Sequence, residues 1–379
     1  MSDAAPELGI LPSQAIAGAI RDGWIRAPAS PVPEANVQPA SLDLRLGDLA
    51  HRLRCSFLPE GAATVEEKLD GLTLESIDLR GGAVLERNRP YLIPLIEELA
   101  LPPDVRGKAN PKSSTGRLDV FTRVITDRGS RFDQIRAGYR GRMYLEVVTR
   151  SFAIRVEPGL SLNQLRLSRG DARCADAQIV AVHREAPLLF AEGRPVPADD
   201  LALADGVFLR IDLTGSDGVG YKARRNAGLL DLSRVGAYEP ADFWEPVHAE
   251  SGRRLILEPE EFYLLVSAEG VRIPPALAAE MTAYDPTAGE LRTHYAGFFD
   301  PGFGFGAERT GTRAVLEVRA HDVPFMVEHG QRVCKLGFER MAEPPELLYG
   351  REIGSSYQDQ ALTVSKHFRA PAAAVTSRG

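Results

Sequence analysis

The stretch 110–118 gathers residue types that bind anions. It reads Asn-Pro-Lys-Ser-Ser-Thr-Gly-Arg-Leu, so Lys112 precedes two adjacent hydroxyls, Ser113 and Ser114, and Arg117 follows shortly after. Hydroxyl and backbone N–H groups in a turn donate hydrogen bonds to an anion, and the arginine guanidinium is a planar fork that matches phosphate oxygens. The pattern favours a phosphate site, although a polar turn that only closes a hairpin would have the same composition.

A second segment, 138–147, places one carboxylate inside an apolar strand. It reads Gly-Tyr-Arg-Gly-Arg-Met-Tyr-Leu-Glu-Val, and Glu146 interrupts a run that is otherwise typical of a buried strand. Burial of a carboxylate costs free energy and raises its pKa, which suits it to exchange protons near neutral pH. The alternative interpretation is an outward-facing glutamate on an alternating strand.

The chain contains the same pattern twice. Glu86 and Tyr91 recur as Glu258 and Tyr263, 172 residues later, and Glu146 recurs as Glu317, 171 residues later. The offset between matching residues changes by only one between Tyr91 and Glu146, which indicates two copies of one domain. The copies differ at the anion-binding stretch, because the second copy has Ala-Tyr-Asp-Pro-Thr-Ala-Gly-Glu at 283–290, with two carboxylates and no basic residue.

Composition and charge exclude several classes of protein. The 379 residues are 44% hydrophobic and 26% charged, which is typical of a globular protein, and the net charge of −7 disfavours a general nucleic-acid binder. The sequence contains no apolar run of about 18 residues, so no membrane helix is expected. It also contains no basic segment followed by an apolar run near its start, so no secretory signal is expected. Three widely separated cysteines, Cys55, Cys174 and Cys334, indicate a reducing cytoplasm.

The predicted fold is mainly all-β. A short helix is expected over Ser13–Arg21, and then short apolar or alternating runs are separated by many of the 35 Gly and 27 Pro residues. Two successive β-barrels or sandwiches are the most economical fold. We expect a first copy over 1–170, a connecting segment over 171–220, a second copy over 221–345 and a C-terminal tail over 346–379.

Four ordered motifs resemble the dCTP deaminase branch of the trimeric dUTPase-like superfamily. They are Lys-Ser-Ser-x-x-Arg-Leu at 112–118, Gly-Tyr-x-Gly-x-x-x-Leu-Glu at 138–146, Pro-Gly-x-x-x-x-Gln-Leu at 158–165, and the run from Tyr349 through Tyr357 to Lys366. The usual chain of that family has one copy, so this sequence resembles a duplicated form. The resemblance implies two tandem dUTPase-like distorted β-barrels with a short N-terminal helix.

The resemblance also implies an activity, the conversion of dCTP and water to dUTP and ammonia. Glu146 would take a proton from the water that attacks C4 and deliver protons to N3 and the leaving amine. Substrate-binding roles would fall to Lys112, Ser113, Ser114, Arg117, Asp133, Tyr139, Gln164, Tyr349, Tyr357 and Gln360. Asp133 is the candidate for the deoxyribose hydroxyl, while Tyr357 and Gln360 would close over the nucleotide.

The resemblance further implies no protein-bound metal and no zinc, with Mg²⁺ arriving on the triphosphate. It implies a cytoplasmic homo-oligomer, dTTP as a possible inhibitor, and neither nucleic acid nor membrane as a partner. A zinc-dependent deaminase would need His-x-Glu and Pro-Cys-x-x-Cys; His248-Ala249-Glu250 matches the first pattern, but the sequence has no Cys-x-x-Cys. Three further functions stay open, namely a dUTPase, a bifunctional dCTP deaminase/dUTPase and a nucleotide sensor without turnover.

Because of the duplication, the roles of Glu146 and Glu317 can be compared directly. Only the first copy has the basic turn, so we expect Glu146 to be catalytic and Glu317 to lack a substrate. The alternative is a site shared between subunits, in which the second copy's glutamate lies against the first copy's turn, and it would reverse this expectation.

Overall fold

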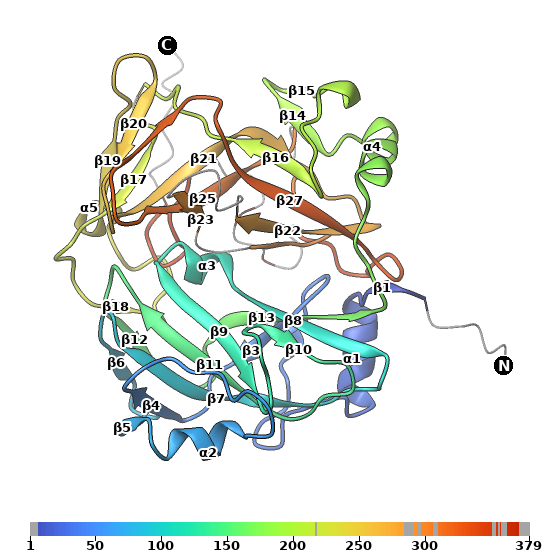
Figure 1. The fold of residues 1–379 in the computed structure, drawn as a ribbon, viewed down its shortest axis with the longest axis vertical. Helices are drawn as coiled ribbons and strands as arrows, with labels where there is room; N and C mark the ends of the chain where they lie inside the picture. Colours follow the sequence, from blue (N-terminus) through green and yellow to red (C-terminus); the bar gives the residue numbers. More distant parts are fainter. Residues whose placement is uncertain are drawn as a thin grey trace, which may run out of the picture.

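The structure is a computed structural model that describes residues 7–216, 218–283, 291–293, 297–305, 310–350, 354, 357 and 362–370. It contains two β-barrels, one from each half of the chain, that stack on each other (Figure 1). The short helix α3 (Ser113–Gly116) lies where the first barrel meets the second (Figure 1). The predictions of a mainly β protein and of two barrels are confirmed.

The first barrel is built from a six-stranded and a five-stranded sheet. In the first sheet, β11 (Arg140–Thr149) lies between β7 (Pro90–Ala100) and β9 (Val120–Thr126). The sheet is completed by β2 (Ile25–Arg26), β4 (Leu49–Leu53) and β5 (Thr73–Asp78). The second sheet consists of β1 (Gly9–Ile10), β3 (Leu42–Arg45), β8 (Val105–Pro111), β10 (Gln134–Ile135) and β13 (Ser161–Arg169). A small sheet joins β6 (Ala83–Leu85), β12 (Ile154–Val156) and β18 (Leu230–Asp231).

The second barrel repeats this plan. Its larger sheet is centred on β21 (Phe262–Val271) and β25 (Thr312–Ala320), and also holds β14 (Leu189–Ala191), β15 (Arg194–Pro195), β17 (Gly220–Ala223), β19 (Trp244–Val247) and β23 (Leu291–Thr293). The smaller sheet contains β16 (Val207–Arg210), β22 (Leu277–Ala283), β24 (Phe298–Phe299) and β27 (Arg332–Arg340). A separate pair is formed by β20 (Arg254–Leu257) and β26 (Phe325–Glu328).

Strand register confirms the internal duplication. Glu146 on β11 faces Leu92 on β7, and Glu317 on β25 faces Leu264 on β21. Leu92 and Leu264 are 172 positions apart, so equivalent residues of the two copies occupy equivalent positions in their sheets.

The predicted helix is confirmed as α1 (Ser13–Arg21), which buries Ile16 and Ala19. The other α-helices are short: α2 (Val65–Leu69), α4 (Asp176–Glu185) and α5 (Pro240–Phe243). Two 3-10 turns occur at Glu34–Asn36 and Ala198–Asp200. None of the helices among the described residues is long and apolar enough to cross a membrane.

The segment 171–220 is more than the connection that the sequence suggested. It contains α4, and its strands β14 and β16 pair with β21 and β27 of the second barrel. Its strands have only two to four residues, too few for an alternating pattern to stand out. The second barrel therefore begins inside this segment.

The two barrels share apolar packing where they meet. Phe152 of the first half is buried with its ring centroid 5.6 Å from that of Phe243 and 5.4 Å from that of Trp244. Phe368 from the end of the described chain packs on the same two rings. The core of the first barrel therefore depends on residues of the second half and of the tail.

This packing predicts cooperative unfolding of the two barrels. Phe152→Ala should lower the free energy of unfolding by about 3–5 kcal/mol, as is typical for a buried Phe. Fluorescence can report each half separately, with Trp24→Phe leaving Trp244 in the second half and Trp244→Phe leaving Trp24 in the first. In denaturant, both signals should shift together when Phe152→Ala is introduced; a shift of only one of the two signals would show that the barrels unfold independently.

Candidate functional site

A cavity of about 260 Å³ opens between the two barrels. The first copy contributes the basic turn, the second copy contributes β25 and the loop around Asp300, and the C-terminal tail closes one side. The predicted site residues that line it are Lys112, Ser113, Ser114, Arg117, Gln164, Tyr349 and Tyr357. Lining residues that the sequence analysis did not assign to the site include Asp43, Asp300, Glu317 and Lys366.

The basic turn is a single helical turn at the end of β8. The Lys112 N–H donates to the Leu162 carbonyl at 3.0 Å, and the Lys112 carbonyl accepts from the N–H groups of Thr115 and Gly116 at 2.8 and 3.0 Å. These bonds fix the backbone that presents Ser113 and Ser114 to the cavity. The turn is therefore a preformed set of donors.

Glu317 of the second copy stands directly against this turn. A Cβ atom added to Gly116 would lie 2.5 Å from Oε2 of Glu317 and 2.8 Å from its Cδ. A side chain at position 116 would therefore force the carboxyl group to move, and glycine is the residue that permits this close approach. The turn of one copy and the glutamate of the other are thus fitted to each other within one chain.

The environment of Glu317 suits it to proton transfer. The residue is 8% exposed, and burial raises its pKa to about 8. The charge of Arg117 opposes this rise and that of Asp119 adds to it. A carboxyl group with its pKa near the working pH can both give and take a proton.

Arg117 is held on several sides. Its guanidinium lies 3.7 Å from the centroid of the Tyr357 ring, and its Nη1 donates to the Thr363 carbonyl at 3.0 Å. The side chain is buried, and its Nε has no hydrogen-bond partner among the described residues. Arg117 therefore links the basic turn, Glu317 and the tail.

Two lysines share one carboxylate on another wall of the cavity. Lys112 pairs with Asp43, whose pKa is raised by burial and held down by Lys112 and Lys366. Burial and the charge of Lys112 lower the pKa of Lys366. Two ammonium groups with one carboxylate between them leave positive charge that a phosphate group would balance.

The tail is tied to the turn by hydrogen bonds. The Ser365 hydroxyl donates to the Ser114 carbonyl at 2.8 Å, and the Lys366 N–H donates to the Tyr357 hydroxyl at 3.0 Å. The Tyr349 N–H donates to the Pro301 carbonyl at 2.8 Å, which places Tyr349 beside the loop of Asp300. The predicted contact Gln360 lies outside the described residues.

Glu146, the predicted catalytic residue, does not line this cavity. It is fully buried on β11, and its Oε1 lies 2.9 Å from Nη2 of Arg123 on the neighbouring strand β9. Its Oε2 has no hydrogen-bond partner within the described part of the chain. The expectation that Glu146 works beside the basic turn is corrected here, because barrel packing brings Glu317 there instead.

Asp133 and Tyr139 also differ from expectation, since neither lines the cavity. The Asp133 carboxylate accepts the Val124 N–H at 2.8 Å, and burial raises its pKa to about 7. The Tyr139 hydroxyl donates to the Arg142 carbonyl at 2.6 Å within the first barrel. Both side chains stabilise backbone in the first copy, which the motif spacing alone could not distinguish from substrate contact.

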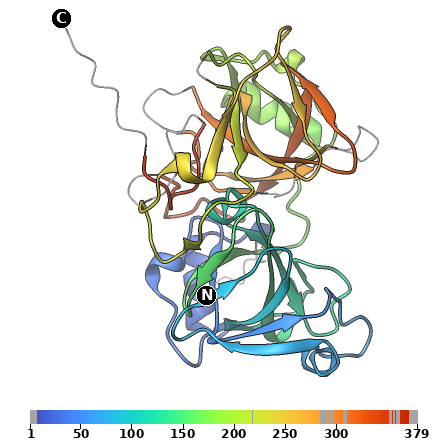
Figure 2. The ribbon, with the colours of Figure 1, turned by 90° about the vertical axis from the view of Figure 1, so that its left-hand side faces the viewer.

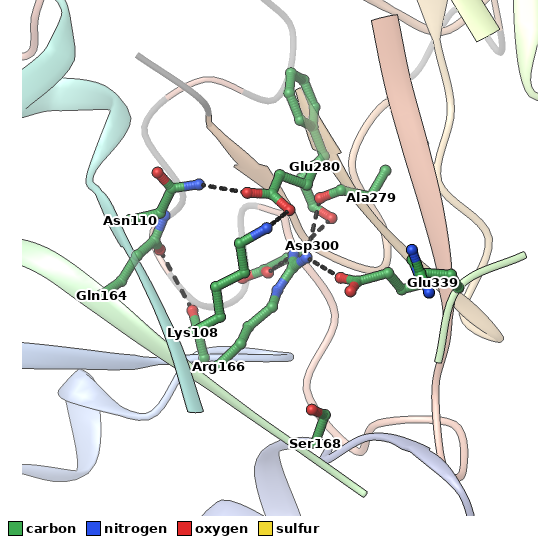
Figure 3. A network of polar contacts seen from close by, with 12 residues as sticks. Lys108, Asn110, Gln164, Arg166, Ser168, Ala279, Glu280, Asp300 and Glu339 are labelled. Carbon is green, nitrogen blue, oxygen red and sulfur yellow. Dashed lines mark hydrogen bonds and ion pairs between the residues drawn. The ribbon is translucent and has the colours of Figure 1, made fainter. Parts of the chain in front are cut away.

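A polar network behind the cavity joins the barrels (Figure 3). Arg166 on β13 crosses to the second copy, where it lies 3.0 Å from the Asp300 carboxylate and 3.3 Å from that of Glu339. It also donates to the Ala279 and Phe299 carbonyls, both at 3.0 Å. This network holds Asp300 and the strand β24 in the wall of the cavity.

Comparison with known proteins agrees with the two-copy organisation. Residues 7–171 match the family model described as 2'-deoxycytidine 5'-triphosphate deaminase N-terminal domain, and residues 175–368 match that of the C-terminal domain. A crystal structure of 2'-deoxycytidine 5'-triphosphate deaminase from Agrobacterium tumefaciens is similar with a TM-score of 0.83 and 45% identity, covering 90% of this chain and 100% of that one.

Shorter similarities connect the chain to curated relatives. "dCTP deaminase, dUMP-forming" of Dictyoglomus turgidum is 29% identical over 123 residues, which are 32% of this chain and 60% of the relative. "dCTP deaminase" of Natronomonas pharaonis is 30% identical over 139 residues, 36% of this chain and 68% of the relative. The matches to the two domain models and to a solved structure over nearly the whole chain confirm the resemblance, and the chain belongs to the dCTP deaminase family in a form with two successive domains.

Proposed function

We propose that this protein hydrolyses dCTP to dUTP and ammonia in the cavity between its barrels, with Glu317 as the general acid/base. The observation that carries the proposal is the fit of Glu317 against Gly116 and Arg117, which joins a proton-transfer group to a basic turn. Family membership supplies the substrate class.

The raised pKa of Glu317 defines the order of proton transfers. With a pKa of about 8 the group is mostly protonated at neutral pH, so it donates first to N3 of cytosine and makes C4 more electrophilic. The resulting carboxylate takes a proton from the water that attacks C4. Glu317 then gives that proton to the amino group; the C4–N bond breaks, ammonia leaves, and the remaining hydroxyl proton returns to Glu317 as C4 becomes a carbonyl.

The other lining residues bind and orient the substrate. Lys112 and Lys366 supply the positive charge for the triphosphate, which arrives with Mg²⁺, and Ser113 and Ser114 supply hydrogen-bond donors. Arg117 fixes Glu317 and stabilises its carboxylate when the proton is away.

Asp300 takes the place that the sequence analysis gave to Asp133. It is the carboxylate that lines the cavity beside Phe298 and Phe299, and it can accept a hydrogen bond from the deoxyribose hydroxyl. Tyr349 and Tyr357 pack over the same cavity, and with Gln360 they would exclude water from the reacting centre.

We also propose that the protein is a cytoplasmic homo-oligomer, that dTTP inhibits it, and that it needs no zinc. The three cysteines are free. No group of three or more His, Cys, Asp and Glu suited to a metal ion occurs in the part of the chain that the structure describes. The names of curated relatives include both "dCTP deaminase" and "dCTP deaminase, dUMP-forming", so dUTP and dUMP must be separated in any assay.

The two equivalent glutamates provide matched variants. Glu317→Gln should lower dCTP deamination by about 10²–10⁴-fold, as is typical for loss of a general acid/base. Glu146→Gln should retain most activity and lose stability, because it leaves Arg123 without its carboxylate. Ion-exchange separation of dCTP, dUTP and dUMP is the measurement.

Folding can be checked in the same pair of variants. A raised carboxyl pKa stabilises the folded state below the ordinary value near 4.5, and this contribution is lost as the pH rises through about 8. Glu317→Gln should therefore be at least as heat-stable as the parent at pH 8. Full activity of Glu317→Gln together with an inactive, folded Glu146→Gln would refute the assignment.

The pH profile tests which carboxyl group transfers the proton. Because Glu317 must start protonated, kcat/KM should fall as the pH rises through about 8. Arg117 lowers the pKa of Glu317, so Arg117→Met should move this limb to higher pH as well as reduce activity. The control is Arg123→Met, next to Glu146, which should not change the pH at which kcat/KM falls. A shift in Arg123→Met but not in Arg117→Met would point to Glu146.

Zinc independence has its own test. Prolonged treatment with a zinc-selective chelator, with Mg²⁺ kept in excess, should leave turnover unchanged. Replacing Cys55, Cys174 and Cys334 together by Ala should also leave it largely intact. Loss of activity that returns on adding zinc would instead support a metal-activated water.

A further inference from the structure

We infer that the first copy carries a second anion site, separate from the substrate cavity, that binds a polyphosphate group. A pocket of about 410 Å³ lies on the first barrel near the second copy. Its lining includes Arg106 and Lys108 of β8 and three arginines of the loop 127–137, namely Arg128, Arg131 and Arg136. We call this the arginine pocket.

The arginine pocket is the counterpart of one wall of the substrate cavity. In the second copy, β24 pairs with β22 so that Phe298 faces Glu280. In the first copy, β10 pairs with β8 so that Gln134 faces Lys108, and Lys108 and Glu280 are equivalent residues 172 positions apart. Where the second copy has Phe298, Phe299 and Asp300, the first copy has Gln134, Ile135 and Arg136.

Several of these arginines have no acidic partner in the described part of the chain. Within the described part of the chain, no carboxylate oxygen forms an ion pair within 4.0 Å of a guanidinium nitrogen of Arg106, Arg128, Arg131 or Arg136. The Arg106 Nε donates to the Ser168 hydroxyl at 3.3 Å, and the Arg136 guanidinium lies over the Tyr139 ring at 5.7 Å. Lys108 and Arg173 of the lining pair with Glu280 and Asp171, so the four arginines supply the positive charge of the pocket that no ion pair uses in that part of the chain.

The acidic residues that line the pocket are engaged elsewhere. The Asp127 carboxylate accepts the Val65 N–H at 2.8 Å, and Glu339 pairs with Arg166 (Figure 3). Arg166 also lines the pocket; it is 2% exposed, and its Nε has no hydrogen-bond partner among the residues that the structure describes. The positive charge of the pocket thus comes from its exposed arginines, because Arg166 is already paired with Asp300 and Glu339.

The loop that carries the arginines is anchored on both sides. The Arg128 N–H donates to the Ala63 carbonyl at 3.0 Å, with φ of 58° at Arg128. The Asp133 N–H donates to the Val124 carbonyl at 2.9 Å, and the Asp133 carboxylate accepts from the Val124 N–H. Asp133 therefore holds the backbone of the loop in place, while the Arg128, Arg131 and Arg136 side chains are exposed and free to reach a bound anion.

The chemistry of the pocket favours phosphate oxygens. Guanidinium groups bind them through two parallel N–H donors, and several converging arginines match an anion with several charges. The wall is less apolar than in the substrate cavity, since Gln134 stands where the second copy has Phe298, and Arg136 follows β10 as Asp300 follows β24. The ligand is thus recognised by its polyphosphate group, as inorganic tripolyphosphate or as the tail of a nucleoside triphosphate.

Calorimetric titration with inorganic tripolyphosphate tests this inference. The intact protein should bind two equivalents per chain, one in each site. Arg128→Ser/Arg131→Ser/Arg136→Ser should lose one of them, with affinity for it reduced at least about 100-fold because several charge-assisted hydrogen bonds disappear. Lys112→Ala should weaken the other equivalent only.

A matched variant controls for net charge. Arg54→Ser/Arg89→Ser/Arg194→Ser removes three exposed arginines far from the pocket lining and should still bind two equivalents. A second titration with dTTP distinguishes the source of the ligand, because binding of tripolyphosphate without dTTP would assign the site to inorganic polyphosphate, and binding of both would include nucleotides.

Two results would overturn the inference. One is a single equivalent in the intact protein; the other is unchanged binding in the triple variant of the arginine pocket. Binding of a single-stranded oligonucleotide in place of tripolyphosphate would also contradict it. Turnover of dCTP in the triple variant should stay within about twofold of the parent, and an absence of turnover in the parent would refute the proposed function while leaving the binding count valid.

Discussion

The approach of Glu317 to Gly116 is the constraint on which the rest of the site depends. This carboxyl group lies so close to the turn that a Cβ at position 116 would come 2.5 Å from its Oε2 atom in the relative position that the two barrels adopt. That position buries Glu317, raises its pKa and sets Arg117 beside it. It also aligns the network in which Arg166 crosses from the first barrel to Asp300 (Figure 3), and the aromatic contacts around Phe152. The view turned by 90° shows the same stacking of the two barrels (Figure 2).

Duplication allowed the two copies to divide the work. The first copy has the basic turn, while its own Glu146 is buried in the barrel and paired with Arg123. The second copy kept a glutamate in a cavity, and its counterpart of the basic turn, 283–290, lies almost wholly outside the described residues. Each copy therefore supplies the half of the site that the other lacks. The surface beside β8 and β10 of the first copy, which corresponds to the cavity wall formed by β22 and β24 of the second copy, carries the arginine pocket.

Local features were predictable from the sequence, and contacts between barrels were not. The helix Ser13–Arg21, the strand-rich halves and the basic turn follow from residue patterns over short stretches, and the repeat follows from its spacing. Which glutamate meets the turn depends on how two barrels pack, and Glu146 and Glu317 both lie in the same local sequence, Leu-Glu-Val. Asp133 was misassigned because a buried carboxylate that binds backbone has the same signature as one that binds substrate. Lys366 and Asp43 come together across more than three hundred residues, which no motif encodes.

The central claim is that one chain holds a complete site made from the turn of its first copy and the glutamate of its second. Co-expression of two differently tagged chains, one with Lys112→Ala and one with Glu317→Gln, tests this most directly. Each chain lacks one half of the site, so purified mixed oligomers should be as inactive toward dCTP as either variant alone. Recovery of a substantial fraction of parental activity in the mixed oligomers would show that turn and glutamate come from different chains, and would contradict the account.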